Sequence, residues 1–119
     1  MDIKVHDSEL KVMEALWNGG EQTAGQLAKT LNEQTGWNRN TTYTVIKKLI
    51  AKGAVARRGP GFTCRAAITK DQVRRSEAAA LLGKLFDGSA GLFLSAFISG
   101  GELSKEDIEH LKSLVEKLK

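Results

Sequence analysis

The chain has 119 residues, 41% of them hydrophobic, and a net charge of +4, which fits one small globular domain with or without an appendage and excludes a disordered chain. The single cysteine, Cys64, excludes an intramolecular disulfide framework and suits a reducing compartment. The sequence shows neither an apolar run of membrane-spanning length nor the start of a signal peptide, so we expect a cytoplasmic protein without membrane insertion.

The positive charge is concentrated in one stretch of the chain. Residues 47–75 hold nine lysines and arginines and a single acid, Asp71, whereas the residues on either side carry more acids than bases. Clustered cations suit a polyanion such as nucleic acid, because each neutralised phosphate releases counterions. A solvated basic surface would show the same clustering, so the charge alone does not decide between the two.

Three helices are predicted in the first half of the chain. Residues 7–18 carry apolar side chains at helical spacing. Thr23 and Gln26 form a capping box that opens a second helix. Asn38 caps a third helix, predicted over 39–52. The buried face of this third helix is expected to contain Thr42, Val45, Ile46, Leu49 and Ile50.

A β-hairpin follows the third helix. Residues 54–58 and 62–68 flank the turn Gly59-Pro60-Gly61 and have strand character. Further helices are predicted from Thr69 to about Phe86, around 92–97, and from Ser104 to the end of the chain. Three helices followed by a hairpin form a winged helix-turn-helix. The predicted fold is therefore mainly α with a small β-hairpin, with a winged-helix DNA-binding domain over 1–70 and a helical dimerisation segment over 71–119.

The outward face of the third helix is the strongest candidate binding surface. Its residues are types that contact base edges or phosphates in the major groove, and no acid occurs from Thr35 to Lys70. A polar helix surface of chance composition is the alternative. The candidate DNA-binding residues are Arg39, Asn40, Thr41, Tyr43, Thr44, Lys47 and Lys48.

The hairpin is the second candidate. Arg57 and Arg58 precede the glycine-rich turn and Arg65 follows it, so a wing of this kind could contact the DNA backbone. An ordinary surface hairpin with solubilising charge is an equal alternative.

The C-terminal third contains more apolar surface than helices of this length can bury alone. Two chains pairing through it would bury that surface in a symmetric dimer. Packing of the segment onto its own winged domain is the alternative. The candidate dimerisation residues are Leu82, Leu85, Phe86, Phe93, Phe97, Leu111, Leu114 and Leu118.

Catalytic and metal-binding patterns are missing from the sequence. His6 and His110 are far apart, and neither spaces with Cys64 as a zinc site would. No glycine-rich phosphate loop follows a predicted strand. We therefore expect no enzyme activity, no cofactor and no metal. Cys64 is interpreted as a small core residue, with redox sensing as the alternative.

Residues 5–17 and 37–49, followed by Lys52-Gly53 and the 103–108 entry to the last helix, resemble the family of penicillinase repressors and methicillin-resistance repressors, which also includes copper-responsive repressors. The resemblance implies a homodimeric transcriptional repressor that binds a two-fold symmetric operator in double-stranded DNA and controls a resistance or stress operon. The cysteine-rich tail of the copper-responsive members is missing, which argues against copper sensing.

The resemblance also implies roles for single residues. Thr41 and Thr44 match base-reading threonines, Tyr43 falls at another reading position, and Lys48 matches a residue that meets the DNA backbone. In antibiotic-responsive members a membrane sensor triggers proteolysis in the dimerisation segment. The matching bond here joins Ala96 to Phe97, with alanine in place of the family's asparagine.

Two alternatives to a repressor come from other functional classes. One is a winged-helix protein-interaction module without specific DNA binding, which would not need an acid-free helix face. The other is a small enzyme, which the missing catalytic residues disfavour.

Overall fold

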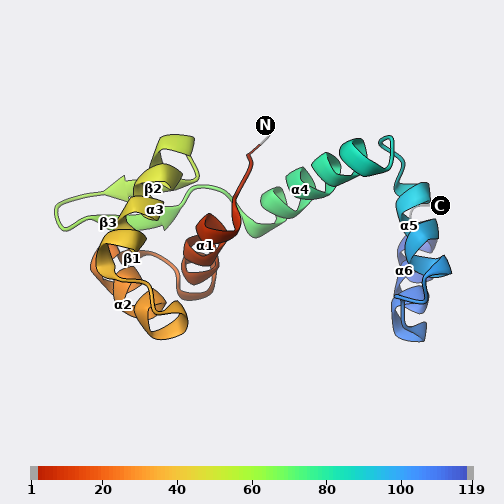
Figure 1. Cartoon of the computed structure of the whole chain (residues 1–119), viewed down its shortest axis with the longest axis horizontal. Coiled ribbons are helices and arrows are strands. Elements are labelled where there is room, and N and C mark those ends of the chain that lie inside the picture. The colour runs from red at the N-terminus through yellow and green to blue at the C-terminus, as the bar shows by residue number, and fades with distance from the viewer. Residues whose placement is uncertain (1–2, 118–119) are drawn as a thin grey trace. The chain divides into compact units, whose positions relative to one another are not determined.

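The computed structural model describes residues 3–117, and the chain divides into two compact units, one ending at Glu77 and the other beginning at Ala78. The elements, labelled in Figure 1, are α1 (Asp7–Gly19), β1 (Gln22–Thr23), α2 (Ala24–Thr35), α3 (Arg39–Lys52), β2 (Val55–Arg58), β3 (Thr63–Ala66), α4 (Lys70–Leu85), α5 (Ala90–Ser99) and α6 (Lys105–Lys117). The order of three helices and a hairpin agrees with the predicted order.

The second and third helices begin at the predicted capping residues. The Thr23 hydroxyl oxygen accepts a hydrogen bond from the Gln26 amide (3.1 Å), and Gln26 Oε1 accepts one from the Thr23 amide (2.9 Å). Asn38 Oδ1 accepts a hydrogen bond from the Thr41 amide (2.8 Å), and α3 ends at Gly53, whose φ of +81° suits glycine. These local bonds fix where α3 starts and therefore which of its residues face inward.

The core of the first unit is formed by one face of each of its first three helices and by residues of the sheet. As predicted, Thr42, Val45, Ile46 and Leu49 of α3 are buried, and Ile50 is half-buried. Because these positions recur at helical spacing, the opposite face of α3 is left exposed.

The sheet is antiparallel and three-stranded, in the order β1-β3-β2. The predicted hairpin pairs Arg57 with Cys64, and Figure 1 shows the short connection between its strands, residues 59–62, extending beyond the helices. The sequence pattern did not predict β1, which pairs Gln22 with Cys64 and Thr23 with Thr63. Two residues that run directly into a helix are too short to show strand periodicity.

The fourth helix belongs to both units. Val73 is buried in the core of the first unit. Ser76 and Glu77 contact residues 3–6, here called the N-terminal arm: the Ser76 hydroxyl donates to the Ile3 carbonyl (3.4 Å), and the Val5 amide donates to Glu77 (3.3 Å). The first unit therefore extends into α4, whereas the predicted boundary lay at the start of this helix.

The second unit leaves many apolar side chains uncovered. Its aromatic rings pack edge to face, Phe86 on Phe93 with 5.2 Å between centroids and Phe93 on Phe97 with 4.7 Å. The exposed large apolar residues are Leu81, Leu85, Leu92, Phe97, Ile98, Leu114 and Val115. Among the other candidate dimerisation residues, Leu82, Phe86, Phe93 and Leu111 are half-buried, and Leu118 lies outside the described residues. Within residues 3–117 no single helix is long and apolar enough to cross a membrane, although the bent pair α4 and α5 meets that criterion by length and composition alone.

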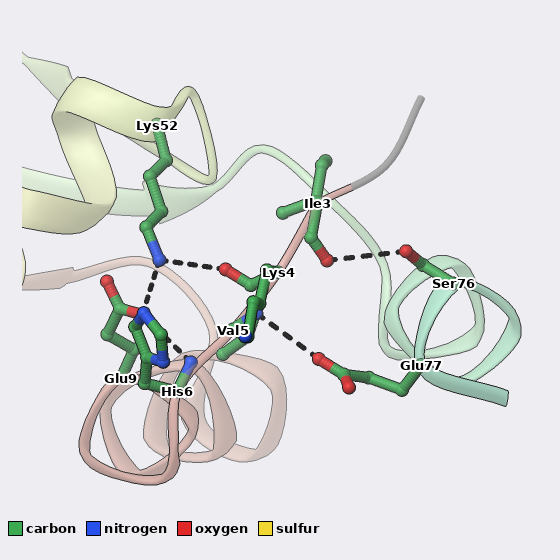
Figure 2. A network of polar contacts seen from close by, with 8 residues as sticks. All are labelled: Ile3, Lys4, Val5, His6, Glu9, Lys52, Ser76 and Glu77. Carbon is green, nitrogen blue, oxygen red and sulfur yellow. Dashed lines mark hydrogen bonds and ion pairs between the residues drawn. The ribbon is translucent and has the colours of Figure 1, made fainter. Parts of the chain in front are cut away.

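The Glu9 carboxylate lies inside the first unit with 2% of its side chain exposed (Figure 2). Its Oε1 accepts hydrogen bonds from Lys52 Nζ (2.5 Å) and from the His6 amide (2.9 Å), and Lys52 Nζ also donates to the Lys4 carbonyl (2.8 Å). Burial raises the pKa of Glu9, but the bonds from Lys52 and His6 outweigh this effect and hold the pKa below its ordinary value. The network connects the end of α3 to α1 and to the N-terminal arm.

The lowered pKa of Glu9 predicts a contribution to stability that acid removes. Such a carboxylate stabilises the fold fully above its unfolded-state pKa of about 4.3, and the contribution is lost as the pH falls through the folded-state pKa. We expect Glu9→Gln to lower the free energy of unfolding at neutral pH by roughly 1–3 kcal/mol and to flatten its decline in acid.

Urea denaturation across the acidic range tests this expectation. Glu14→Gln is the matched control, since it removes a partly exposed ion pair with Lys70 (3.2 Å) and should cost less than about 1 kcal/mol. Equal acid sensitivity of Glu9→Gln and the unmodified chain would contradict the assignment.

Candidate nucleic-acid interface

The exposed face of α3 brings together most of the residues predicted to bind DNA. Asn40, Thr41, Thr44, Lys47 and Lys48 are all exposed, one to two turns apart on the helix side opposite the core. The packing of the buried face fixes the direction of these side chains, so the face is presented by a rigid helix.

A hollow of about 480 Å³ lies along this face. Its lining residues are Ser8, Trp37, Asn38, Asn40, Thr41, Thr44, Val45 and Lys48. Within it, the Thr44 hydroxyl donates to the Asn40 carbonyl one turn earlier (2.9 Å). Because the hydroxyl hydrogen is used inside the helix, Thr44 offers its methyl group and the lone pairs of its oxygen to a ligand.

Tyr43 is placed differently from the other predicted reading residues. Its side chain is half-buried, its hydroxyl accepts a hydrogen bond from Arg39 Nη2 (2.9 Å), and the Arg39 guanidinium carbon lies 5.0 Å from the ring centroid. The ring meets Phe62 edge to face, with 5.7 Å between centroids. Arg39 and Tyr43 thus form a pair that leans toward the hairpin.

The three wing arginines have different surroundings. The Arg57 guanidinium stacks over the Phe62 ring, 4.0 Å from its centroid. Arg58 Nη1 lies 3.4 Å from Glu21 Oε1 in an exposed ion pair, which contributes little and is easily exchanged for a phosphate. Arg65 is exposed and pairs with Ala56 across the hairpin.

Phe62 is a contact residue that the sequence pattern did not single out. The available signal was an aromatic residue directly after the glycine-rich turn. Its role became visible only through its contacts with Tyr43 and Arg57, which are distant from it in sequence or across the hairpin.

The charge of the exposed α3 face is positive and uncompensated. Lys47 and Lys48 make no ion pair with any residue of the described range 3–117. Since no acid lies between residues 35 and 70 of the sequence, this face would not repel a phosphate backbone.

Cys64 lies in β3 with none of its surface exposed. Burial raises the pKa of its thiol, against the opposing effect of Arg57, so the less reactive protonated form is favoured. This placement supports the predicted packing role over redox sensing. Over residues 3–117, no group of three or more His, Cys, Asp or Glu side chains is arranged to hold a metal ion.

Comparison with known proteins relates the whole chain to repressors. The family model described as penicillinase repressor matches residues 5–117. The penicillinase repressor of Bacillus licheniformis is 25% identical over 118 residues, which cover 98% of this chain and 92% of that protein. The methicillin resistance regulatory protein MecI of Staphylococcus aureus (strain N315) is 22% identical over 122 residues, which cover 98% of this chain and 99% of that protein.

Solved structures match the part of the chain that contains the winged helix. The solution structure of the DNA binding domain of the repressor BlaI has a TM-score of 0.54 at 26% identity and covers 59% of this chain and 88% of that chain. The Bacillus licheniformis BlaI monomeric form in complex with the blaP half-operator has a TM-score of 0.52 at 26% identity, covering 60% and 89%. The predicted winged helix-turn-helix fold is confirmed, and the family is one of regulators and not of enzymes. Since the family model spans nearly the whole chain, this protein belongs to the penicillinase repressor family.

Proposed function

We propose that this protein is a sequence-specific DNA-binding transcriptional repressor that acts on a resistance or stress operon. The proposal depends above all on the exposed, acid-free face of α3, whose opposite face packs into the core of the first unit. The solved BlaI structure with its half-operator supports the proposal, because the same fold binds DNA there.

The proposed binding mode places α3 in the major groove. Thr41 and Thr44 read base edges, Thr44 through its methyl group against a thymine methyl. Asn40 lies in the same hollow, where its amide can bond to a base. Lys47 and Lys48 lie one turn further along and neutralise phosphates. In the wing, Arg58 and Arg65 contact the backbone on the adjoining side of the site.

Two copies are proposed to bind a two-fold symmetric operator as a homodimer. The uncovered apolar side chains of the second unit supply the pairing surface, with Leu85, Phe97 and Leu114 the most exposed of the predicted residues. A symmetric pair would place two α3 helices in successive major grooves, roughly 34–36 Å apart.

Relief of repression by a regulatory protease or a membrane sensor is proposed on the family resemblance. The candidate bond, between Ala96 and Phe97, lies within α5, and both residues are exposed. Cleavage there would detach α6 and part of α5, and with them much of the proposed pairing surface. The helix would have to open locally before a protease could engage the bond.

Selection of bound sequences from random DNA provides the operator for the tests. A palindromic consensus with binding that weakens at higher salt supports the proposed function. No binding, or binding that does not depend on salt, would favour the protein-interaction module instead.

Thr44→Ala removes the methyl group that we place against a base. We expect the preference for the selected operator over a scrambled duplex to fall by about 1–3 kcal/mol. The measurement is a fluorescence anisotropy titration of both duplexes at one salt concentration. An unchanged preference would show that Thr44 does not read sequence.

Lys48→Ala removes a phosphate contact without touching base readout. We expect weaker binding to operator and scrambled DNA by the same factor, and a negative slope of log affinity against log salt that is shallower by about 0.9. Lys105→Ala, in α6 of the second unit, removes the same charge and serves as the control. Equal slopes for the two variants would contradict the contact.

Leu114→Glu places a charge on the proposed pairing surface. We expect the variant to sediment as a monomer at concentrations where the unmodified chain is a dimer, because an unpaired charge is costly to bury in an interface. Ser113→Glu, at the neighbouring exposed position of α6, is the matched control and should remain dimeric. A dimer that survives Leu114→Glu would place the pairing surface elsewhere.

A further inference from the structure

A continuous set of ring and guanidinium contacts joins α3 to the wing, the β2–β3 hairpin. Arg39 donates a hydrogen bond to the Tyr43 hydroxyl, and the Tyr43 ring meets the Phe62 ring edge to face. Arg57 stacks over the Phe62 ring. We call Arg39, Tyr43, Phe62 and Arg57 the aromatic link. Its members come from α3 and from the β2–β3 hairpin, two elements that would contact DNA in different places.

The backbone of Phe62 is also anchored. Its carbonyl accepts a hydrogen bond from the amide of Ala24, the first residue of α2 (2.9 Å). Its φ of +51° lies in the left-handed region, which is strained for a non-glycine residue and persists where surrounding contacts hold it. Phe62, directly after the turn of the wing, is therefore fixed by α2 through its backbone and by α3 through its ring.

The start of α2 also borders the link. A Cβ built on Gly25 would lie 4.0 Å from both Arg39 Nη2 and Tyr43 Oη, so even a methyl group at this position of α2 would touch the pair. The half-buried Tyr43 has its hydroxyl engaged and its ring edge occupied. These contacts favour a supporting role for Tyr43 over the base-reading role that the family resemblance implies.

We propose that Tyr43 and Phe62 are positioning residues that hold the wing in register with α3, so that wing arginines reach phosphates while α3 reads bases. The inference rests on the proposed DNA-binding function. Edge-to-face ring pairs and guanidinium stacking each contribute beyond simple burial, which gives the wing a defined attachment where a turn rich in glycine would otherwise leave it loosely held.

A double-mutant cycle tests the coupling. In the unmodified chain, Arg58→Ala should make the negative slope of log affinity against log salt shallower by about 0.9, the value for one phosphate contact. In a Phe62→Ala background the same change should have little effect, because the displaced wing no longer reaches that phosphate. Additive effects, or no effect of Arg58→Ala in the unmodified chain, would overturn the proposal.

Two further variants separate positioning from base reading and from misfolding. Tyr43→Leu should weaken binding to all duplexes and leave the order of base preference intact, and Tyr43→Phe, which retains the ring contact, should restore most of the loss. A changed base preference in Tyr43→Leu would overturn the positioning role. Phe62→Leu replaces Phe62→Ala if the latter fails to fold.

The effect of Lys48→Ala is measured in the same Phe62 background as an internal control. If Lys48→Ala still weakens DNA binding in this background, α3 still contacts DNA. The lost phosphate contact is then confined to the wing. If the unmodified chain shows no salt-dependent DNA binding at all, the proposed function fails. If it binds and the cycle is additive, only the positioning inference fails.

Discussion

The presentation of the proposed DNA-binding face of α3 depends on how Thr42, Val45, Ile46 and Leu49 pack into the core of the first unit. An α-helix has 3.6 residues per turn, so fixing these positions fixes the direction of every other side chain on α3. Rotating the helix would bury Lys47 or Lys48 and expose leucine and isoleucine, and both changes are costly. Thr42 is fully buried among these residues although its side chain is polar.

Features with local causes were predictable from the sequence. The caps at Thr23 and Asn38 depend on side chains that bond within four residues, and the bounds of α3 agree with the predicted ones. The strand β1 was not predicted, because its two residues become a strand only by pairing with β3. Phe62 was likewise not recognised as a contact residue, because its partners lie on another element or across the turn.

The residues proposed to read DNA also divide into those placed by local spacing and those placed by tertiary contacts. Helical spacing predicted that Thr44, Lys47 and Lys48 would be exposed together, and they are. Spacing also placed Tyr43 on that face, but it could not reveal that the ring is half-buried against the hairpin. Whether a side chain at the edge of a helix face is exposed or buried depends on which neighbouring element it contacts. That neighbour is determined by tertiary structure and not by helical spacing.

The extension of the first unit into α4 has a consequence for dissecting the protein. A fragment cut before Lys70 would lose Val73 from the core, and with it the partners of the N-terminal arm at Ser76 and Glu77. The freed arm carries the Lys4 carbonyl that holds Lys52, so such a truncation would also loosen the last turn of α3. A fragment meant to keep the first unit intact would therefore have to retain the first two turns of α4, a helix whose remainder belongs to the other unit.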